Sequence, residues 1–492
     1  MAPVIASLPR AGGPIEVRVI GEANRGEEIR LIPDTFESRT VPVQGVSSRV
    51  AVLTPTLHGF AWAWAMSLLV AGLLVVSLIT LKGESLREAV SATAPLKARS
   101  LMDPAAADSW NAMLLAYRGH LSDPERSLYD VFFDESVKFQ YPPTALLAID
   151  LLPSALVTDP GAARHGGPLR QLLDAISRLA IGLTLLFSAL AVKGTIERLE
   201  QRSLSVREAT LVTVGCFLLG LTFYPLIRAY QLGQIQVFLD CFIALSAFLL
   251  VSGRAAWAGA CLGACCLIKP QYALVLLWAG LRKEWRLAGG MCAVGIPVGM
   301  FSLFRFGLAD HLDYLRVLSD LSRYGEAFWA NQSINGILQR ALGNGDALRF
   351  DPHNFPPYHP VIHATTLATY ASLIVASFWW KASWPRGDLE RGVSVALVIT
   401  AATMGSPIAW EHHYGALLPF VLVALPLALA AKPLGRATMP VWVAAYFGMG
   451  TILLRPELIY SGSGLNPFGM HIFAGGVLFF VLLIALRSRR AP

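Results

Sequence analysis

The most reactive side chains of this sequence stand close together in one short stretch. Ser-Pro-Ile-Ala-Trp-Glu-His-His-Tyr at positions 406–414 places Glu411 beside His412 and His413, between two long apolar runs. A lone histidine there would more often be structural, whereas a carboxylate beside two imidazoles favours function. Imidazoles can donate hydrogen bonds to an anion, and a carboxylate can accept a proton or orient a neighbouring ring.

Four more polar groups interrupt apolar sequence, and each also has a structural explanation. Tyr141-Pro142-Pro143 could simply start a helix, because proline suits the first turn. The segment 231–234, Gln-Leu-Gly-Gln, could be a turn between helices, and 331–336, Asn-Gln-Ser-Ile-Asn-Gly, a loop turn. Lys269 at membrane depth could extend its ammonium to the interface. An intramembrane cation is nevertheless costly and is a functional candidate by default.

The composition indicates what kind of scaffold must position these groups. Of 492 residues, 54% are hydrophobic and only 15% charged, with a mean hydropathy of +0.53, whereas soluble domains are about a quarter charged. The six cysteines lie in apolar runs and show no zinc or disulfide spacing. The net charge of +7 fits basic cytoplasmic loops facing anionic lipid, so no nucleic-acid partner is expected.

Apolar runs long enough to cross a bilayer, about 20 residues each, recur along the chain and predict an all-α polytopic membrane protein. Runs at 255–268 and 273–281 are split by Lys269-Pro270, and the run at 144–157 is short, so these segments are expected to tilt or re-enter. The full-length runs lie at 59–81, 171–192, 209–227, 235–252, 287–304, 361–380, 392–410, 414–431, 437–454 and 467–486.

Lysine and arginine in the short loops mark the cytoplasmic side. If 144–157 does not fully cross and the two runs around Lys269 count as two crossings, that rule gives about twelve spans with both termini inside. The transmembrane domain then covers 58–487, with two long outer loops, 82–143 and 305–360. Residues 1–57 then form a polar, partly disordered cytoplasmic extension, and 488–492 a basic cytoplasmic tail. Nearly all of the unusual polar residues lie on the outer face.

Taken in order, these groups resemble the polyprenol-phosphate-mannose-dependent glycosyltransferases of family 87, α-mannosyltransferase-like members of the GT-C superfamily. The shared pattern is Tyr-Pro-Pro after the first outer loop, Gly-Gln at the head of a span, Leu-Lys ending a small-residue helix, Asn-Gln-Ser with a later Gly, and Ser-Pro-Ile-x-Trp-x-His-His. It covers about 58–430. The resemblance implies a GT-C-type fold with about 12 transmembrane helices, short or re-entrant helices and outer-face loops, in the plasma membrane.

The resemblance also implies an activity: inverting transfer of a sugar, with mannose expected, from a polyprenyl-phosphate donor to a hydroxyl of a glycolipid or glycan on the outer face. One carboxylate base suffices for such a displacement, because phosphate leaves without a proton. The family keeps its base shortly after the first span, which matches Asp108. The family's aromatic pair is replaced here by Trp110-Asn111, and Asp103 and Asp134 are alternative bases.

The remaining roles also follow from the resemblance and the residue types. Lys269, His412 and His413 are predicted to bind the donor phosphate, and since adjacent helical residues diverge, only one imidazole is expected to face it. No metal or other cofactor is implied. The predicted partners for the sugar and acceptor hydroxyls are Tyr141, Gln234, Asn331, Gln332 and Glu411.

Two other classes of protein stay open. A transporter or lipid-linked-glycan flippase would also have about twelve spans with both termini inside, and Asp240, buried in a span, would be its coupling carboxylate. Against it, the two halves show no internal repeat and the polar residues gather at one face. An O-antigen ligase or polymerase would use arginine and histidine pairs in an outer loop, where Arg305, Arg316 and Arg323 are found.

Overall fold

The structure is a computed structural model that describes residues 99–488, with gaps at 160, 163–165, 380–386 and 451–466, and scattered positions between 58 and 80. In this part of the chain the regular structure is helical, and the β-structure amounts to one isolated bridge between Asn331 and Trp410. The predicted all-α fold class is confirmed. The N-terminal extension 1–57 and most of the first span lie outside the described residues.

Several helices are long and apolar enough to cross a membrane. Within the described residues five qualify, and a sixth does if α8 and α9, which are bent by 58° relative to each other, form one broken span. The five are α7 (Pro168–Glu200), α13 (Trp285–Tyr324), α15 (Pro360–Trp379), η3 with α17 (Glu411–Ala431) and α20 (His471–Ser488). The protein is therefore a polytopic membrane protein, while the total of about twelve spans stays a prediction.

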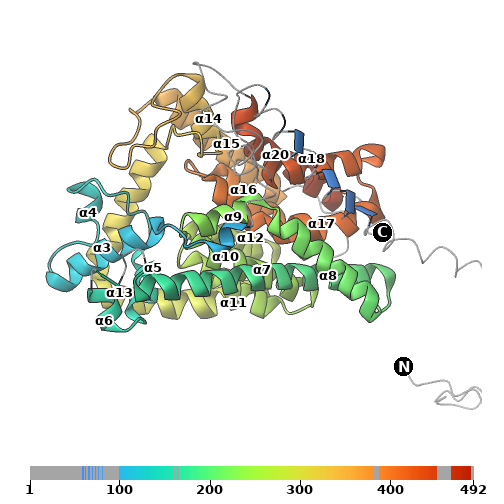
Figure 1. Ribbon diagram of the computed structural model, residues 1–492, viewed down its shortest axis with the longest axis horizontal. Coiled ribbons are helices and arrows are strands. Elements are labelled where there is room, and N and C mark those ends of the chain that lie inside the picture. The colour runs from blue at the N-terminus through green and yellow to red at the C-terminus, as the bar shows by residue number, and fades with distance from the viewer. Residues whose placement is uncertain are drawn as a thin grey trace, which may run out of the picture. The chain divides into compact units, whose positions relative to one another are not determined.

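The shorter helices complete two groups that pack around the same hydrophobic core (Figure 1). One group lies alongside α7 and includes α10 and α11; the other contains α16, α17, α18 and α20. Their bounds are α8 (Val206–Leu221), α9 (Tyr224–Gln231), α10 (Gln236–Val251), α11 (Ala255–Cys266), η2 (Pro270–Tyr272), α12 (Ala273–Arg282), α14 (Ile334–Ala341), α16 (Asp388–Gly405), α17 (Leu418–Ala431), η4 (Gly435–Ala437), α18 (Thr438–Gly450) and η5 (Pro467–Met470).

Small residues bring α11 and α13 into direct backbone contact. A Cβ at Gly259 would lie 2.1 Å from the Leu287 carbonyl oxygen, and one at Gly290 would lie 1.9 Å from the Ala256 carbonyl oxygen. Because helices inside a membrane associate through such close packing, these glycines fix α11. The loop after α11, which carries Lys269, is thereby fixed as well.

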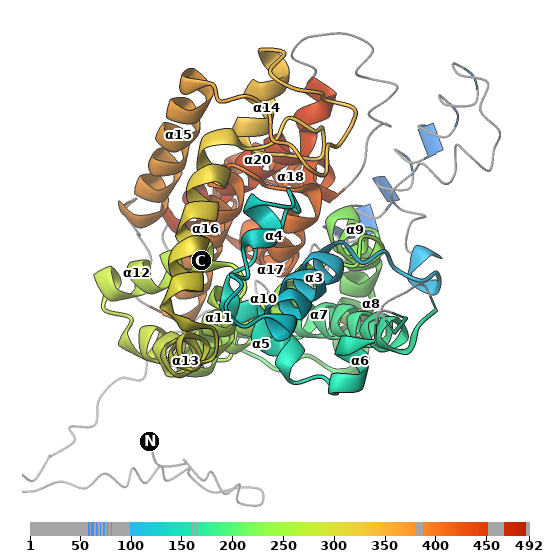
Figure 2. The ribbon, with the colours of Figure 1, turned by 90° about the vertical axis from the view of Figure 1, so that its left-hand side faces the viewer.

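The described part of the predicted first outer loop, and the segment that follows it, form four helices. Helices α3 (Asp108–Ser122), α4 (Asp130–Phe133), α5 (Pro143–Asp150) and α6 (Ser154–Thr158) lie side by side in Figure 2 and share a second hydrophobic cluster. Trp110, Tyr129 and Phe139 are buried in that cluster. Helix α5 has 8 residues and α6 has 5, so each is far shorter than the span that a bilayer requires.

Helix α13 continues into the segment predicted as the second outer loop. It is broken at Gly307 (φ 79°), close to the predicted start of that loop at 305, and its second part continues to Tyr324. Figure 2 shows the second part turning sharply away from the first part. The second part packs on the loop between α3 and α4: the Leu128 amide donates to Asp310, and the Tyr314 ring lies 5.9 Å from the Tyr129 ring. The predicted bounds of the outer loop stay a prediction.

Candidate active site

Asp108 is placed by the Gln-Leu-Gly-Gln turn that follows α9. The Ala106 amide donates to the Gln231 carbonyl at 2.7 Å, and the Asp108 amide donates to the Leu232 carbonyl at 3.0 Å. Gly233 has φ +64°, and a Cβ there would lie 1.8 Å from the Ala106 carbonyl oxygen. Only glycine fits this position, so the glycine of the motif permits the close approach that sets Asp108 at the start of α3.

Ser109 connects three of the polar groups. Its hydroxyl donates to Gln234 Oε1 at 2.7 Å, accepts from the Ile235 amide at 3.1 Å, and lies 2.7 Å from the Tyr141 hydroxyl. Gln234 Nε2 in turn donates to Asp108 Oδ2 at 3.4 Å. The structure thus brings together Asp108, Gln234 and Tyr141, which are far apart in sequence. We call Asp108, Ser109, Tyr141 and Gln234 the Asp108 cluster.

The environment of Asp108 suits a general base. Asp108 is solvent-exposed at the first position of α3, yet partial burial raises the pKa of its carboxyl group, while Arg228, Gln234 and Arg170 act in the lowering direction. A base with a raised pKa takes up a proton more readily. Burial also raises the pKa of Tyr141 to about 12, so that phenol stays protonated and serves as a hydrogen-bonding partner.

The two alternative bases lie elsewhere. Asp103 is exposed, and its backbone carbonyl accepts a hydrogen bond from the Tyr230 hydroxyl at 2.8 Å. Asp134 is exposed at the C-terminal end of α4. Neither side chain belongs to the hydrogen-bonded Asp108 cluster, so the contacts favour Asp108 among the three.

Lys269 lies where the chain breaks between α11 and η2. Its ammonium donates to Gln236 Oε1 at 2.7 Å, and Gln236 Nε2 donates to Asp240 Oδ1 at 2.7 Å. The Thr144 hydroxyl donates to the Leu267 carbonyl, which attaches the start of α5 to this break. Tyr-Pro-Pro-Thr and Leu-Ile-Lys are therefore adjacent in space. Gln236 was not among the residues that the sequence singled out.

Glu411 binds a cation instead of an imidazole. Its Oε1 accepts from Arg228 Nε at 2.7 Å and from the Tyr224 hydroxyl at 2.8 Å, and the Glu411 side chain is 1% exposed. These contacts join η3 (Glu411–Leu417) to α9. Arg228 and Tyr224 were missed from sequence, although Tyr224-Pro225 at the end of an apolar run with a cation one turn later would have marked a broken helix.

The two histidines lie together. Their ring centroids are 4.7 Å apart in an edge-to-face arrangement. Within the described residues, both ring nitrogens of His412 and Nδ1 of His413 are buried without a hydrogen-bond partner. Since buried polar atoms are nearly always satisfied, these nitrogens are candidates for binding a ligand.

Asn331 holds the histidine-bearing segment in place. Its amide nitrogen donates to the Glu326 carbonyl at 2.8 Å and the Pro407 carbonyl at 3.0 Å, and its oxygen accepts from the Ala409 amide at 2.9 Å. The isolated bridge with Trp410 continues this pairing. Asn-Gln-Ser thus pairs with Ser-Pro-Ile-x-Trp.

Gln332 extends the same attachment. Its amide nitrogen donates to the carbonyls of Trp329 and Gly469, both at 2.8 Å, and its own backbone carbonyl accepts from the Tyr414 hydroxyl at 2.6 Å. Gln332 is 1% exposed. These bonds connect the loop before α14, the histidine segment and the turn before α20.

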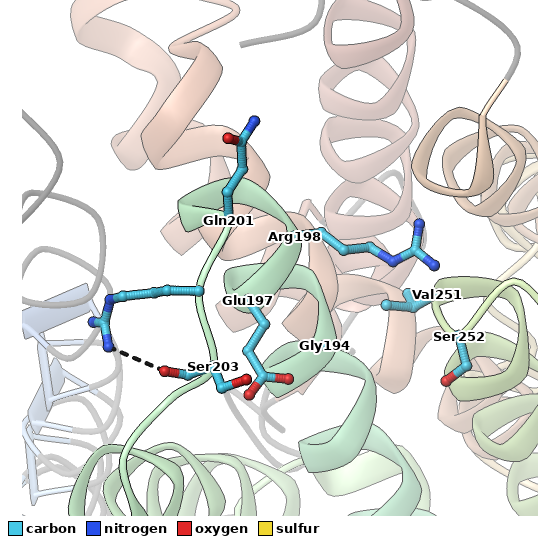
Figure 3. Close-up of a pocket in the computed structure, with 8 residues that line it drawn as sticks. Gly194, Glu197, Arg198, Gln201, Ser203, Val251 and Ser252 are labelled. Atoms are coloured by element: carbon cyan, nitrogen blue, oxygen red, sulfur yellow. Dashed lines mark hydrogen bonds between the residues drawn. The ribbon is translucent and has the colours of Figure 1, made fainter. Parts of the chain in front are cut away.

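One cavity lies far from these residues. It has a volume of about 560 Å³ and is shown in Figure 3. Arg170, near Asp108, and Gly194, in the cavity wall, are about 36 Å apart along α7 at 1.5 Å per residue. We call the part that carries the Asp108 cluster, Lys269 and the histidines the site end, and the part around this cavity the opposite end. The cavity is lined by Gly194, Glu197, Arg198, Gln201, Arg202, Ser203, Val251 and Ser252.

Two arginines of the predicted second outer loop, Arg305 and Arg316, form ion pairs with aspartates. Arg305 donates to both carboxylate oxygens of Asp150, at 3.2 and 3.3 Å, and Arg316 donates to Asp313 at 2.7 Å. Among the described residues no group of three or more histidine, cysteine or acidic side chains could hold a metal ion.

The fold and site define a polytopic membrane protein with a carboxylate base candidate in one cluster and a lysine and two imidazoles in the neighbouring elements. A model of glycosyltransferase family 87 matches residues 139–407, more than half of the chain. The chain belongs to glycosyltransferase family 87 and is a membrane glycosyltransferase, as the resemblance predicted. No curated protein and no solved structure matches it. The matched segment includes Tyr141, Gln234 and Lys269, whereas Asp108 and the histidines lie outside it and are assigned by geometry.

Proposed function

We propose that the protein transfers a sugar, with mannose the first candidate, from a polyprenyl-phosphate donor to a hydroxyl of a glycolipid or glycan acceptor, with inversion. One observation carries this proposal: α9 joins an accessible carboxylate to buried imidazoles without partners, because its Arg228 binds Glu411 beside His412 and the turn after it holds the Asp108 amide. A base on one side and anion donors on the other are what displacement of a phosphate requires.

Asp108 is the proposed general base. It takes the proton of the acceptor hydroxyl while that oxygen attacks C1 of the sugar from the side opposite the phosphate. The C1–O bond to the phosphate breaks, and its electron pair leaves with the lipid phosphate. Since that phosphate is a good leaving group, no acid is needed, and the single base candidate is sufficient.

Lys269, His412 and His413 are the proposed ligands of the donor phosphate. An ammonium group and imidazole N–H groups make charge-assisted hydrogen bonds to phosphate oxygens, and such bonds are stronger where water is excluded. A phosphate here would also satisfy the His412 nitrogens that are buried without partners among the described residues.

Tyr141 and Gln234 are the proposed partners of sugar or acceptor hydroxyls, because both lie beside Asp108. Asn331, Gln332 and Glu411 are 0%, 1% and 1% exposed, and each is bound to the protein through at least one polar side-chain atom. We assign these three to positioning the segment that carries the histidines. Neither a metal nor another cofactor enters this mechanism.

We further propose that the site end faces outward from the plasma membrane, since basic residues such as Arg198 and Arg202 lie at the opposite end. In a background without native cysteines, Asn354→Cys, an exposed position after α14, should react with an impermeant thiol reagent in intact cells. Ser252→Cys, in the wall of the large cavity, should react only after permeabilisation. The reverse pattern contradicts the orientation.

Activity is tested with purified protein, radiolabelled polyprenyl-phosphate-mannose and a panel of glycolipid and glycan acceptors. Label should reach an acceptor from the lipid donor and not from a nucleotide sugar supplied in parallel. Transfer from the nucleotide sugar alone would exclude the proposed donor. Transport of the lipid-linked sugar across vesicles without transfer would support the flippase alternative.

A further inference from the structure

Asp240 is a carboxylate in the middle of α10 that the proposed mechanism does not use. Its side chain is 0% exposed, and Oδ1 accepts a hydrogen bond from Gln236 one helical turn earlier. Gln236 accepts in turn from the Lys269 ammonium. A buried carboxylate in an apolar helix is costly unless something compensates for it. The relay through Gln236 to Lys269 supplies part of that compensation.

The second oxygen of Asp240 faces the histidine segment. A Cβ at Gly415 would lie 2.3 Å from Asp240 Oδ2 and 3.0 Å from Cγ. The carboxylate therefore packs directly on the backbone of η3, two residues after His413. In the described part of the chain this oxygen is buried without a hydrogen-bond partner. Asp240 thus contacts both parts of the proposed phosphate site, Lys269 through Gln236 and the histidine segment at Gly415.

We infer that Asp240 is a positioning residue for the lipid-phosphate ligand, which rests on the function proposed above. Through Gln236 it orients the Lys269 ammonium, and at Gly415 it sets where η3 presents the imidazoles. The neutral amide between the two charges matters. A direct ion pair would compete with the phosphate for the ammonium, whereas Gln236 occupies only one of its three hydrogens.

The test measures binding of a prenyl monophosphate to the purified full chain and the donor KM and kcat of transfer. Asp240→Asn should weaken binding about 5- to 50-fold and raise the donor KM more than it lowers kcat. Gly415→Ala should have the same effect from the other side, because its Cβ would displace the carboxylate. Ser246→Ala removes another buried polar group of α10 and should leave binding unchanged.

Coupling to Lys269 separates positioning from a merely structural role. Lys269→Ala alone should weaken binding, and adding Asp240→Asn to it should weaken binding little further, because both act through one ammonium. Additive losses in the double variant overturn the inference. So does normal binding by Asp240→Asn, or by Gly415→Ala if Asp240→Asn does not fold, provided that Lys269→Ala is impaired. A wild-type protein that does not bind prenyl phosphate overturns the proposed function as well.

Discussion

The site end and the opposite end of the molecule differ in how their polar side chains are paired. The opposite end has the 560 Å³ cavity, and the charges around it are paired with each other: Arg198 lies 2.8 Å from Asp388, and Arg202 lies 2.8 Å from Glu208. At the site end, three buried polar atoms of Glu411 and His412 have no hydrogen-bond partner among the described residues. The proposed site therefore rests on these atoms and not on the cavity.

The charged groups at the opposite end form ion pairs; even Glu200, whose oxygens make no hydrogen bond among the described residues, lies 2.8 Å from Arg202. Lys193 pairs with Glu197, and Ser205 and Glu208 form a reciprocal cap that starts α8. Such caps and exposed ion pairs stabilise a helix end, and the groups that form them already have hydrogen-bond partners.

At the site end, buried atoms without partners among the described residues include Asp240 Oδ2, Glu411 Oε2, Gln332 Oε1 and both nitrogens of His412. Leaving such an atom unsatisfied costs about 1–3 kcal/mol. Four of these five atoms come from only two neighbouring elements, α10 and η3. A ligand with several oxygens, such as a phosphate, would recover part of this free energy.

The largest effect is expected at Asp108. Asp108→Asn keeps the size of the side chain but cannot accept a proton at neutral pH, so sugar transfer should fall by about 10²–10⁴-fold, the usual contribution of a general base. Binding of prenyl phosphate should persist, because Asp108 is exposed and lies apart from the proposed phosphate ligands. The measurement is initial transfer rate at saturating donor.

Asp103→Asn and Asp134→Asn provide matched controls, since both residues are exposed carboxylates of the same segment. Near-normal transfer by the Asp108 variant, together with loss in either control, would show that Asp108 is not the general base. The contrast between the two ends would then no longer identify the catalytic site.

A second large effect is expected from the turn that places Asp108. Gly233→Ala would put a Cβ 1.8 Å from the Ala106 carbonyl oxygen and push the start of α3 away. A displacement of about 1 Å can cost about 10²-fold in rate. Gly343→Ala is the control, because Gly343 also has φ +64° but nothing within 4 Å of its Cβ position. Equal losses in the two variants would trace the effect to backbone strain alone.

A smaller effect is expected at the histidines. His412→Ala removes the side chain whose nitrogens have no protein partner among the described residues, so it should cost the donor complex a charge-assisted contact of about 1.5–3 kcal/mol, or about 10- to 150-fold in affinity. Thermal stability should stay the same or rise, because an unsatisfied buried group is removed. Unchanged affinity for prenyl phosphate would make His412 a packing residue.

Sequence reasoning predicted the helical membrane fold, which follows from local signals, and it named most of the residues of the candidate site, whose roles stay predictions. Apolar runs, a Lys at membrane depth and a Glu-His-His cluster are visible without a structure. The partners of these residues were not predictable, since Ser109, Arg228 and Gln236 are ordinary polar residues until distant segments meet. Asp240 was named from sequence as the coupling carboxylate of a transporter, and its hydrogen-bond partner on the same helix, Gln236, was not predicted.

Gly307 and Gly233 show a second limit of prediction from sequence, which is the role of individual glycines. The first lets α13 continue after a bend, and the second lets a turn approach Ala106. A glycine in a sequence does not say which backbone will approach it. The sequence therefore did not predict the second part of α13, and the Gly-Gln motif was recognised without a reason for its glycine.

The smallest effect is expected at the opposite end and completes the comparison. Arg198→Gln removes a guanidinium that lines the large cavity and lies 2.8 Å from Asp388. Because both side chains are partly exposed, the pair contributes at most about 1 kcal/mol to stability, and the melting temperature in detergent should fall by a few degrees or less. Transfer should stay within about twofold of wild type, since no group of the site end changes its partner. A loss of transfer approaching that of Asp108→Asn would show that this cavity takes part in the reaction. The cavity, and not the unpaired polar atoms, would then mark the functional site.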